Sequence, residues 1–90
     1  DLVTKELTIN GKKFTVHELS VRQRLEMFAA NKDEKDATRM NAQLVRLGCD
    51  KFSKYTVDEL LDISGAVFDG VDNVVADLSG MGDEKGKKQK

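Results

Sequence analysis

The sequence predicts an α+β fold that is mostly helical, with an N-terminal β-hairpin packed on a small bundle of about four helices. Three features predict this fold: an Asn-Gly pair between two alternating segments, two helix-capping boxes, and apolar residues at helical spacing. The chain has 90 residues, the size of one small domain. We therefore expect a single folded domain over residues 1–81 and a disordered, charged tail over residues 82–90, which lack apolar residues.

The β-hairpin is expected over residues 5–16. The dipeptide Asn10-Gly11 tolerates the positive φ angles of a type I′ turn, the usual two-residue connection between antiparallel strands. With this turn, four apolar side chains share one face of the hairpin: Leu7, Ile9, Phe14 and Val16. An isolated hairpin is only marginally stable in water, so this face should pack on the helices.

Two capping boxes predict where helices begin, because each pairs an N-cap hydroxyl with a Glu or Gln three residues later. The pairs are Ser20 with Gln23, and Thr56 with Glu59. They predict helices over residues 20–30 and 57–63. In the first helix, we expect the side chains that face the core to be those at helical spacing, Val21, Leu25 and Phe28.

Two further helices follow from apolar spacing and from helix breakers. One is predicted over residues 33–47, with Gly48 as its C-terminal stop. The other is predicted over residues 65–78, because Ser64-Gly65 offers a break and a fresh N-cap.

The composition does not favour an enzyme, and no cofactor or metal is expected. His17 is the sole histidine and Cys49 the sole cysteine, so neither a metal site nor a thiol dyad with a second histidine is suggested. A formal net charge of −1 gives no field to attract nucleic acid. No run approaches the roughly 20 apolar residues that span a bilayer, and no secretory signal is visible, so a reducing cytoplasm is expected.

Two segments resemble a known protein family. Residues 14–26 contain Leu-Ser-Val-Arg-Gln-Arg-Leu-Glu after a predicted strand, and residues 73–81 read Asn-Val-Val-Ala-Asp-Leu-Ser-Gly-Met. Both segments, in this order and placement, resemble the tail assembly chaperones of lambda-like long-tailed bacteriophages. Together they cover about a quarter of the chain, one near each end.

This resemblance implies a role in assembly. The family's short, non-frameshifted form binds the tape measure protein and keeps it soluble while the major tail protein polymerises around it. A longer, frameshifted form carries an extra segment thought to recruit the major tail protein. The resemblance thus implies the host bacterial cytoplasm as the location, absence from the mature virion, and a homo-oligomer that coats its client.

Several residues are candidates for these roles. The apolar residues expected to lie outside the core stripes could form a client or self-association surface, although each could instead widen a core stripe: Met27, Phe68, Val75 and Met81. The capping residues are interpreted as structural. In the tail, the codons of four residues permit the family's slippery run for programmed frameshifting, while a solubilising tail explains them equally well: Lys85, Gly86, Lys87 and Lys88.

Two alternatives to the chaperone remain open. A small nucleic-acid-binding regulator is suggested by helices near a hairpin and by the lysine-rich tail, although residues 83–90 carry a local charge of only about +2. A small head–tail joining protein has a similar size but stays in the particle. Mass spectrometry of purified virions distinguishes it from a chaperone.

Overall fold

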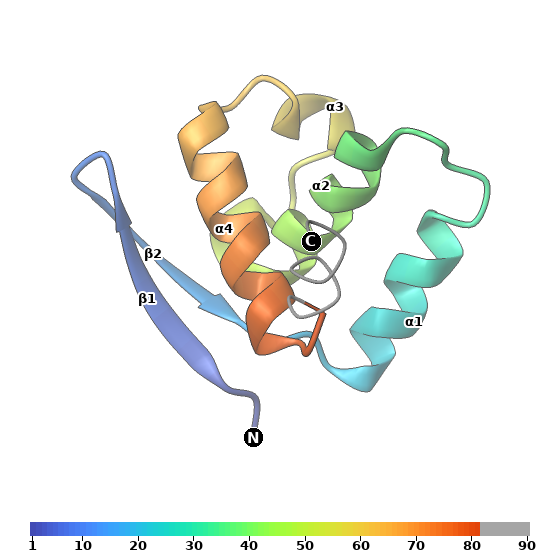
Figure 1. Cartoon of the computed structure of the whole chain (residues 1–90), viewed down its shortest axis with the longest axis horizontal. Coiled ribbons are helices and arrows are strands. Elements are labelled where there is room, and N and C mark those ends of the chain that lie inside the picture. Colours follow the sequence, from blue (N-terminus) through green and yellow to red (C-terminus); the bar gives the residue numbers. More distant parts are fainter. Residues whose placement is uncertain (82–90) are drawn as a thin grey trace, which may run out of the picture.

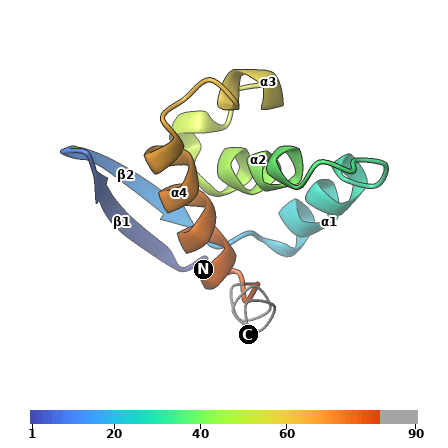
Figure 2. The same ribbon diagram turned by 45° about the horizontal axis from the view of Figure 1, so that its top comes forward.

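The computed structural model describes residues 1–81 and shows the α+β, mostly helical fold that the sequence predicts. Its elements follow in the order β1 (Thr4–Ile9), β2 (Lys12–His17), α1 (Val21–Ala30), α2 (Ala37–Gly48), a short 3₁₀ helix η1 (Asp50–Phe52), α3 (Val57–Leu60) and α4 (Gly65–Leu78). The hairpin lies along α4, and α2 lies between α4 and α1 (Figures 1 and 2). Helix α1 therefore lies at the edge of the domain.

The hairpin has the register that its sequence predicts. Ile9 pairs with Lys12 and Leu7 with Phe14, around a turn in which Asn10 and Gly11 have φ angles of 53° and 77°. Both values fit the type I′ turn. Phe14 is buried, and Leu7 and Ile9 are partly buried against the core, so the apolar face packs as expected.

Both predicted capping boxes are present. The Ser20 and Thr56 hydroxyls each accept a hydrogen bond from the backbone N–H three residues later, and the Gln23 and Glu59 side chains accept from the cap N–H groups in return. The helix after Thr56 is shorter than the predicted span of residues 57–63. It ends at Leu60 because the following N–H groups turn to i→i−3 carbonyls, which tightens the chain.

The predicted span of the helix over residues 33–47 was also too long at its start. The carboxylate of Asp36 accepts hydrogen bonds from two backbone N–H groups of the first helical turn, so Asp36 is the N-cap and α2 begins at Ala37. The Glu34 carboxylate holds the preceding turn by accepting from the backbone N–H groups of Lys35 and Asp36. Local carboxylate bonds thus replace the expected first helical turn.

The prediction that Gly48 stops this helix as a residue beyond its end was wrong. Gly48 is the last helical residue, and Cys49 follows in extended conformation and forms a β-bridge with Val16. A β-carbon built at Gly48 would lie 2.4 Å from Cγ1 of Val75 on α4. Glycine is needed here for the close approach of α2 and α4, which form the centre of the core.

Candidate functional site

Helix α1 turns three of its apolar side chains to solvent. Val21, Leu25 and Phe28 are 75%, 66% and 59% exposed, so the prediction that they face the core was wrong. Met27 is buried instead, and the Gln23 side chain donates a hydrogen bond to the carbonyl of Leu47 on α2. Because α1 packs mainly on α2, one narrow face is enough to hold it, and the opposite face stays open.

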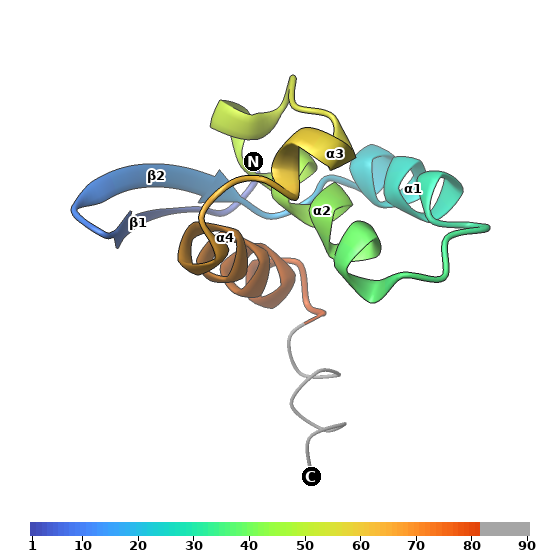
Figure 3. The ribbon, with the colours of Figure 1, turned by 90° about the horizontal axis from the view of Figure 1, so that it is seen from above.

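We call Val21, Leu25 and Phe28 the α1 stripe, since they follow one another at i, i+4 and i+7 along one face of the helix. Scattered exposed apolar side chains are ordinary on a protein surface, but three aligned on one ridge are a mark of an interaction site. Figure 3 shows α1 at the edge of the domain, where nothing within residues 1–81 covers this outer face. The α1 stripe is the candidate functional site.

Arginines border the α1 stripe on both sides. At about 100° per residue, Arg22 and Arg24 project to opposite flanks of the ridge. The guanidinium of Arg24 donates to the carbonyl of Ser79 over 2.9 Å, whereas Arg22 makes no ion pair within residues 1–81. An ion pair between Glu26 and Arg46, 3.1 Å long, joins α1 to α2 behind the ridge. The ridge is therefore apolar at its crest and basic along its rim.

The structure brings the two segments that carry the family resemblance into direct contact. The hydroxyl of Ser79, in the C-terminal segment, accepts a buried hydrogen bond of 2.9 Å from the backbone N–H of Leu19, in the N-terminal segment. Arg24 reaches the carbonyl of the same serine. Together with the capping box, these bonds fix where α1 begins and how it sits against the end of α4. Within the resembling segments, these residues position α1, and two of the three stripe residues, Val21 and Leu25, lie in the N-terminal segment itself.

The residues predicted to form the client surface lie mostly in the core. Met27 is 4% exposed, Phe68 8% and Val75 0%, so the prediction of a surface built from these three was wrong. Phe68 and Val75 widen the face of α4 that packs on α2, which is the alternative that the sequence left open. Met81 is partly buried, and its N–H donates to the carbonyl of Ala76.

Helical periodicity alone could not separate the two apolar faces of α1. The exposed ridge has the longer apolar series, and the buried face has only Met27 beside the amide of Gln23. Within the sequence, the feature that indicates the buried face of α1 is the capping box of Ser20 and Gln23. The Gln23 side chain bonds the backbone at the start of the helix, next to Leu19, which is buried in the core. The predicted frameshift residues 85–88 lie outside the residues that the structure describes.

Reactive side chains in the described region have structural surroundings. His17 Nδ1 lies 2.7 Å from the carbonyl of Glu18, and its Nε2 lies 3.6 Å from the exposed carboxylate of Asp50. Burial raises the pKa of the Cys49 thiol, so the thiol stays protonated and is a poor nucleophile. Within residues 1–81, no group of three or more His, Cys, Asp or Glu side chains is placed to hold a metal ion. No helix in this region has the length and apolar content to cross a membrane.

Comparisons with models of protein families, with curated proteins and with solved structures found no match to this chain. Function must therefore be inferred from the site and from the two resembling segments. Of these, the α1 stripe gives direct physical information, because its exposure, spacing and charge restrict the kind of partner that it fits.

Proposed function

We propose that this chain is the short, non-frameshifted form of a tail assembly chaperone of a long-tailed bacteriophage. In this role it binds the tape measure protein and keeps it soluble during tail morphogenesis. The observation that carries the proposal is the exposed α1 stripe, a ridge of three apolar side chains on a helix at the edge of a small domain. The resemblance of residues 14–26 and 73–81 to the family supplies the identity of the client.

The α1 stripe suits a helical client. An elongated helical protein exposes apolar stripes that would otherwise self-associate, and a second helix can cover such a stripe by packing ridges into grooves. Arg22 and Arg24 on the rim favour a client helix whose stripe is bordered by carboxylates, because opposite charges across an interface guide register and partner choice. The preferred client segment is therefore an amphipathic helix with Glu or Asp beside its apolar positions.

The size of the α1 stripe implies weak binding at each contact. Burying one large apolar side chain contributes roughly 1.5–3 kcal/mol, whereas association costs on the order of 4–15 kcal/mol in lost freedom. The free energy gained by burying three such side chains is therefore similar to the cost of association, and a single contact binds weakly. Many copies along one long client would supply the avidity that a single copy lacks, and weak single contacts let the tail subunits displace the chaperone.

The proposal also includes the remaining partners and the location. A frameshifted longer form would add a segment that recruits the major tail protein, and the protein would act in the host bacterial cytoplasm and be absent from the mature virion. The codons of Lys85, Gly86, Lys87 and Lys88 decide whether a frameshifted form can be made, since AAG-GGA-AAA or GGA-AAA-AAA would provide the slippery run. Detection of the chain in purified virions by mass spectrometry would instead support a head–tail joining protein.

Co-expression with the tape measure protein tests the proposal. The unchanged chain should yield a soluble complex with several chaperones per client, while Leu25→Ser combined with Phe28→Ser should leave the client insoluble. Val3→Ser is the matched control, because Val3 is 53% exposed but lies outside α1. Circular dichroism should show that all variants are folded. A client that stays insoluble with the unchanged chain, or that the stripe variant solubilises equally well, would overturn the proposal.

A further inference from the structure

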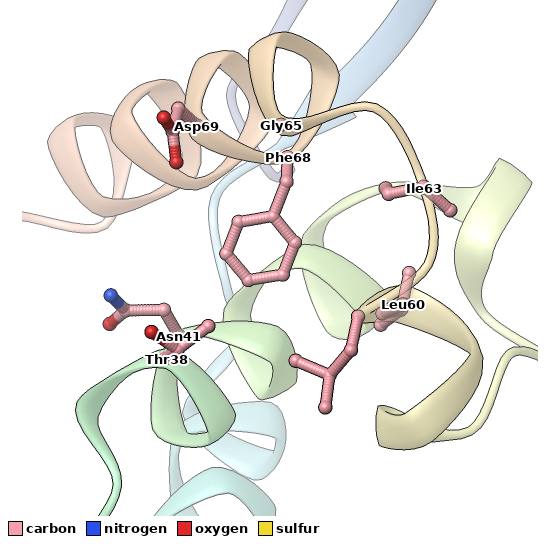
Figure 4. A pocket seen from close by; sticks show the side chains of 8 residues that line it. Thr38, Asn41, Leu60, Ile63, Gly65, Phe68 and Asp69 are labelled. Atoms are coloured by element: carbon pink, nitrogen blue, oxygen red, sulfur yellow. The ribbon is translucent and has the colours of Figure 1, made fainter.

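A pocket of about 230 Å³ opens between α2, α3 and the first turns of α4. Figure 4 shows the ring of Phe68 pointing from α4 toward α2, with Leu60 and Ile63 beside it. Phe68 and Leu60 are buried, whereas Leu61, which also lines the pocket, is 41% exposed. A cavity of about 150 Å³ with an apolar lining is known to hold benzene, so this pocket has room for one large apolar side chain.

The α2 side of the pocket is polar. Thr38 and Asn41 line it there, and the side-chain amide of Asn41 makes no hydrogen bond to any of residues 1–81. An amide carries both a donor and an acceptor, as the backbone of a peptide does, so the two can bond each other. An amide of this kind beside an apolar pocket suits a peptide segment better than it suits an apolar small molecule.

Carboxylates border the same pocket. Asp69 of α4 lines it, and Asp62 belongs to the loop after α3 that forms part of its lining. Both aspartates are exposed, and neither makes an ion pair within the part of the chain that the structure describes. Arg39 of α2 is already paired with another carboxylate, that of Asp58, over 2.7 Å. The rim therefore offers two unpaired negative charges to a basic partner.

We infer that this pocket binds a segment of a partner protein in which one large apolar side chain is flanked by arginine or lysine. The apolar side chain of the segment, its anchor, enters the pocket and covers Leu61. The basic neighbours of the anchor face Asp62 and Asp69. The amide of Asn41 bonds the backbone of the segment beside the anchor.

The pocket and the α1 stripe select segments of opposite charge. Among residues 1–81, those that line the pocket come from α2, from α3 and the loop after it, and from α4, whereas the stripe lies on α1. The stripe has arginines beside it and favours a segment with carboxylates, while the pocket favours a basic segment. The inference therefore does not rest on the proposed client. Loss of client binding through the stripe would leave binding in the pocket unchanged, and the reverse also holds.

Titration of the isotope-labelled protein with short peptides, followed by NMR, tests the inference. The probe is an acetylated and amidated peptide, Gly-Arg-Ala-Phe-Ala-Arg-Gly, which presents one aromatic anchor between two cations. It should shift the backbone amide signals of Leu61 and Phe68 and leave those of α1 in place. Alanine in place of the phenylalanine of the peptide should weaken binding about tenfold or more, because no large side chain is then buried. Glutamate in place of both arginines should also weaken binding.

Protein variants separate the pocket from general surface charge. Asp69→Asn should weaken binding of the probe about two- to fivefold, because it removes one exposed carboxylate from the rim. Asp77→Asn is the matched control, since Asp77 is an exposed carboxylate on the same helix, about two turns beyond Asp69. It should bind the probe like the unchanged chain. Leu61→Ser removes exposed apolar surface at the pocket and should weaken binding without unfolding the protein, which the dispersion of the NMR signals verifies.

Several results would overturn the inference. They are a probe that shifts no pocket signal even at millimolar concentration, a glutamate peptide that binds as tightly as the arginine peptide, and an equal loss of binding in Asp69→Asn and Asp77→Asn. Pocket signals that shift with protein concentration alone, without peptide, would show that a second copy occupies the pocket and would also overturn it.

Discussion

The hydroxyl of Ser79 accepts a hydrogen bond of 2.9 Å from the backbone N–H of Leu19, and both residues are almost completely buried. This bond joins the end of α4 to the start of α1 across 60 positions of the chain. Arg24 adds a second link to the same residue by donating to its carbonyl. The serine thus determines how α1, and with it the α1 stripe, is placed on the rest of the domain.

Replacement of Ser79 by alanine should therefore destabilise the fold. The Leu19 N–H would be left buried without an acceptor, which costs about 1–3 kcal/mol. Urea denaturation measures the change in the free energy of unfolding. Ser53→Ala is the matched control, because the Ser53 hydroxyl bonds the carbonyl of Asp50 at an exposed site and its loss should change stability by less than about 0.5 kcal/mol. Equal effects of the two substitutions would contradict the structural role of Ser79.

The orientation of α1 predicts a large loss of stability at one of its apolar residues and almost none at another. Met27→Ala should cost about 2–5 kcal/mol, because it removes a buried side chain that is 4% exposed. Leu25→Ala should change stability by less than about 0.5 kcal/mol, because that side chain is 66% exposed. Thermal and urea denaturation provide the comparison. A larger loss at Leu25 than at Met27 would mean that α1 is rotated relative to the orientation described.

The elements that local chemistry determines could be predicted from the sequence. The Asn10-Gly11 turn sets the hairpin register, and the hydroxyl-to-glutamine or glutamate spacing marks the starts of α1 and α3. These signals act within a few residues, so no knowledge of the rest of the fold is needed. The start of α2 was missed because the Asp36 carboxylate caps the helix after the predicted start at residue 33.

The side of a helix that faces the core depends on contacts from distant parts of the chain. For α1, the longer apolar series Val21, Leu25 and Phe28 was expected to be buried, but the capping amide of Gln23 turns the other face toward Leu47. The α1 stripe could not be predicted for the same reason. It is defined by the face of α1 that α2 leaves uncovered, and that depends on packing between elements.

The buried thiol of Cys49 should make stability depend on alkaline pH. Because burial raises the pKa of the thiol in the folded state, the fold holds this proton more tightly than the unfolded chain does. The contribution is fully present below the unfolded pKa and is lost as the pH rises through the folded pKa. Urea denaturation between about pH 7 and pH 10 should show a steeper loss for the unchanged chain than for Cys49→Ala. Parallel curves would contradict the prediction, since other groups titrate equally in both proteins.

Three glycine-to-alanine substitutions separate close packing from helix propensity. At Gly48, a β-carbon would lie 2.4 Å from Cγ1 and 2.5 Å from Cγ2 of Val75, which is fully buried and has a branched, stiff side chain. The two methyl groups of Val75 have no room to move aside, so Gly48→Ala should destabilise the fold by about 1–3 kcal/mol.

The other two positions offer matched controls. A β-carbon at Gly65 meets nothing within 4 Å, so alanine there should be neutral or stabilise by up to about 1 kcal/mol through helix propensity. At Gly70 it would lie 2.6 Å from the terminal methyl of Ile9, which can rotate away because Ile9 is only partly buried. Gly70→Ala should therefore fall between the other two in urea denaturation. The reverse order, with Gly48→Ala the most stable variant, would show that α2 and α4 do not pack as closely as described. The higher helix propensity of alanine can raise stability only where the added methyl group meets no neighbour.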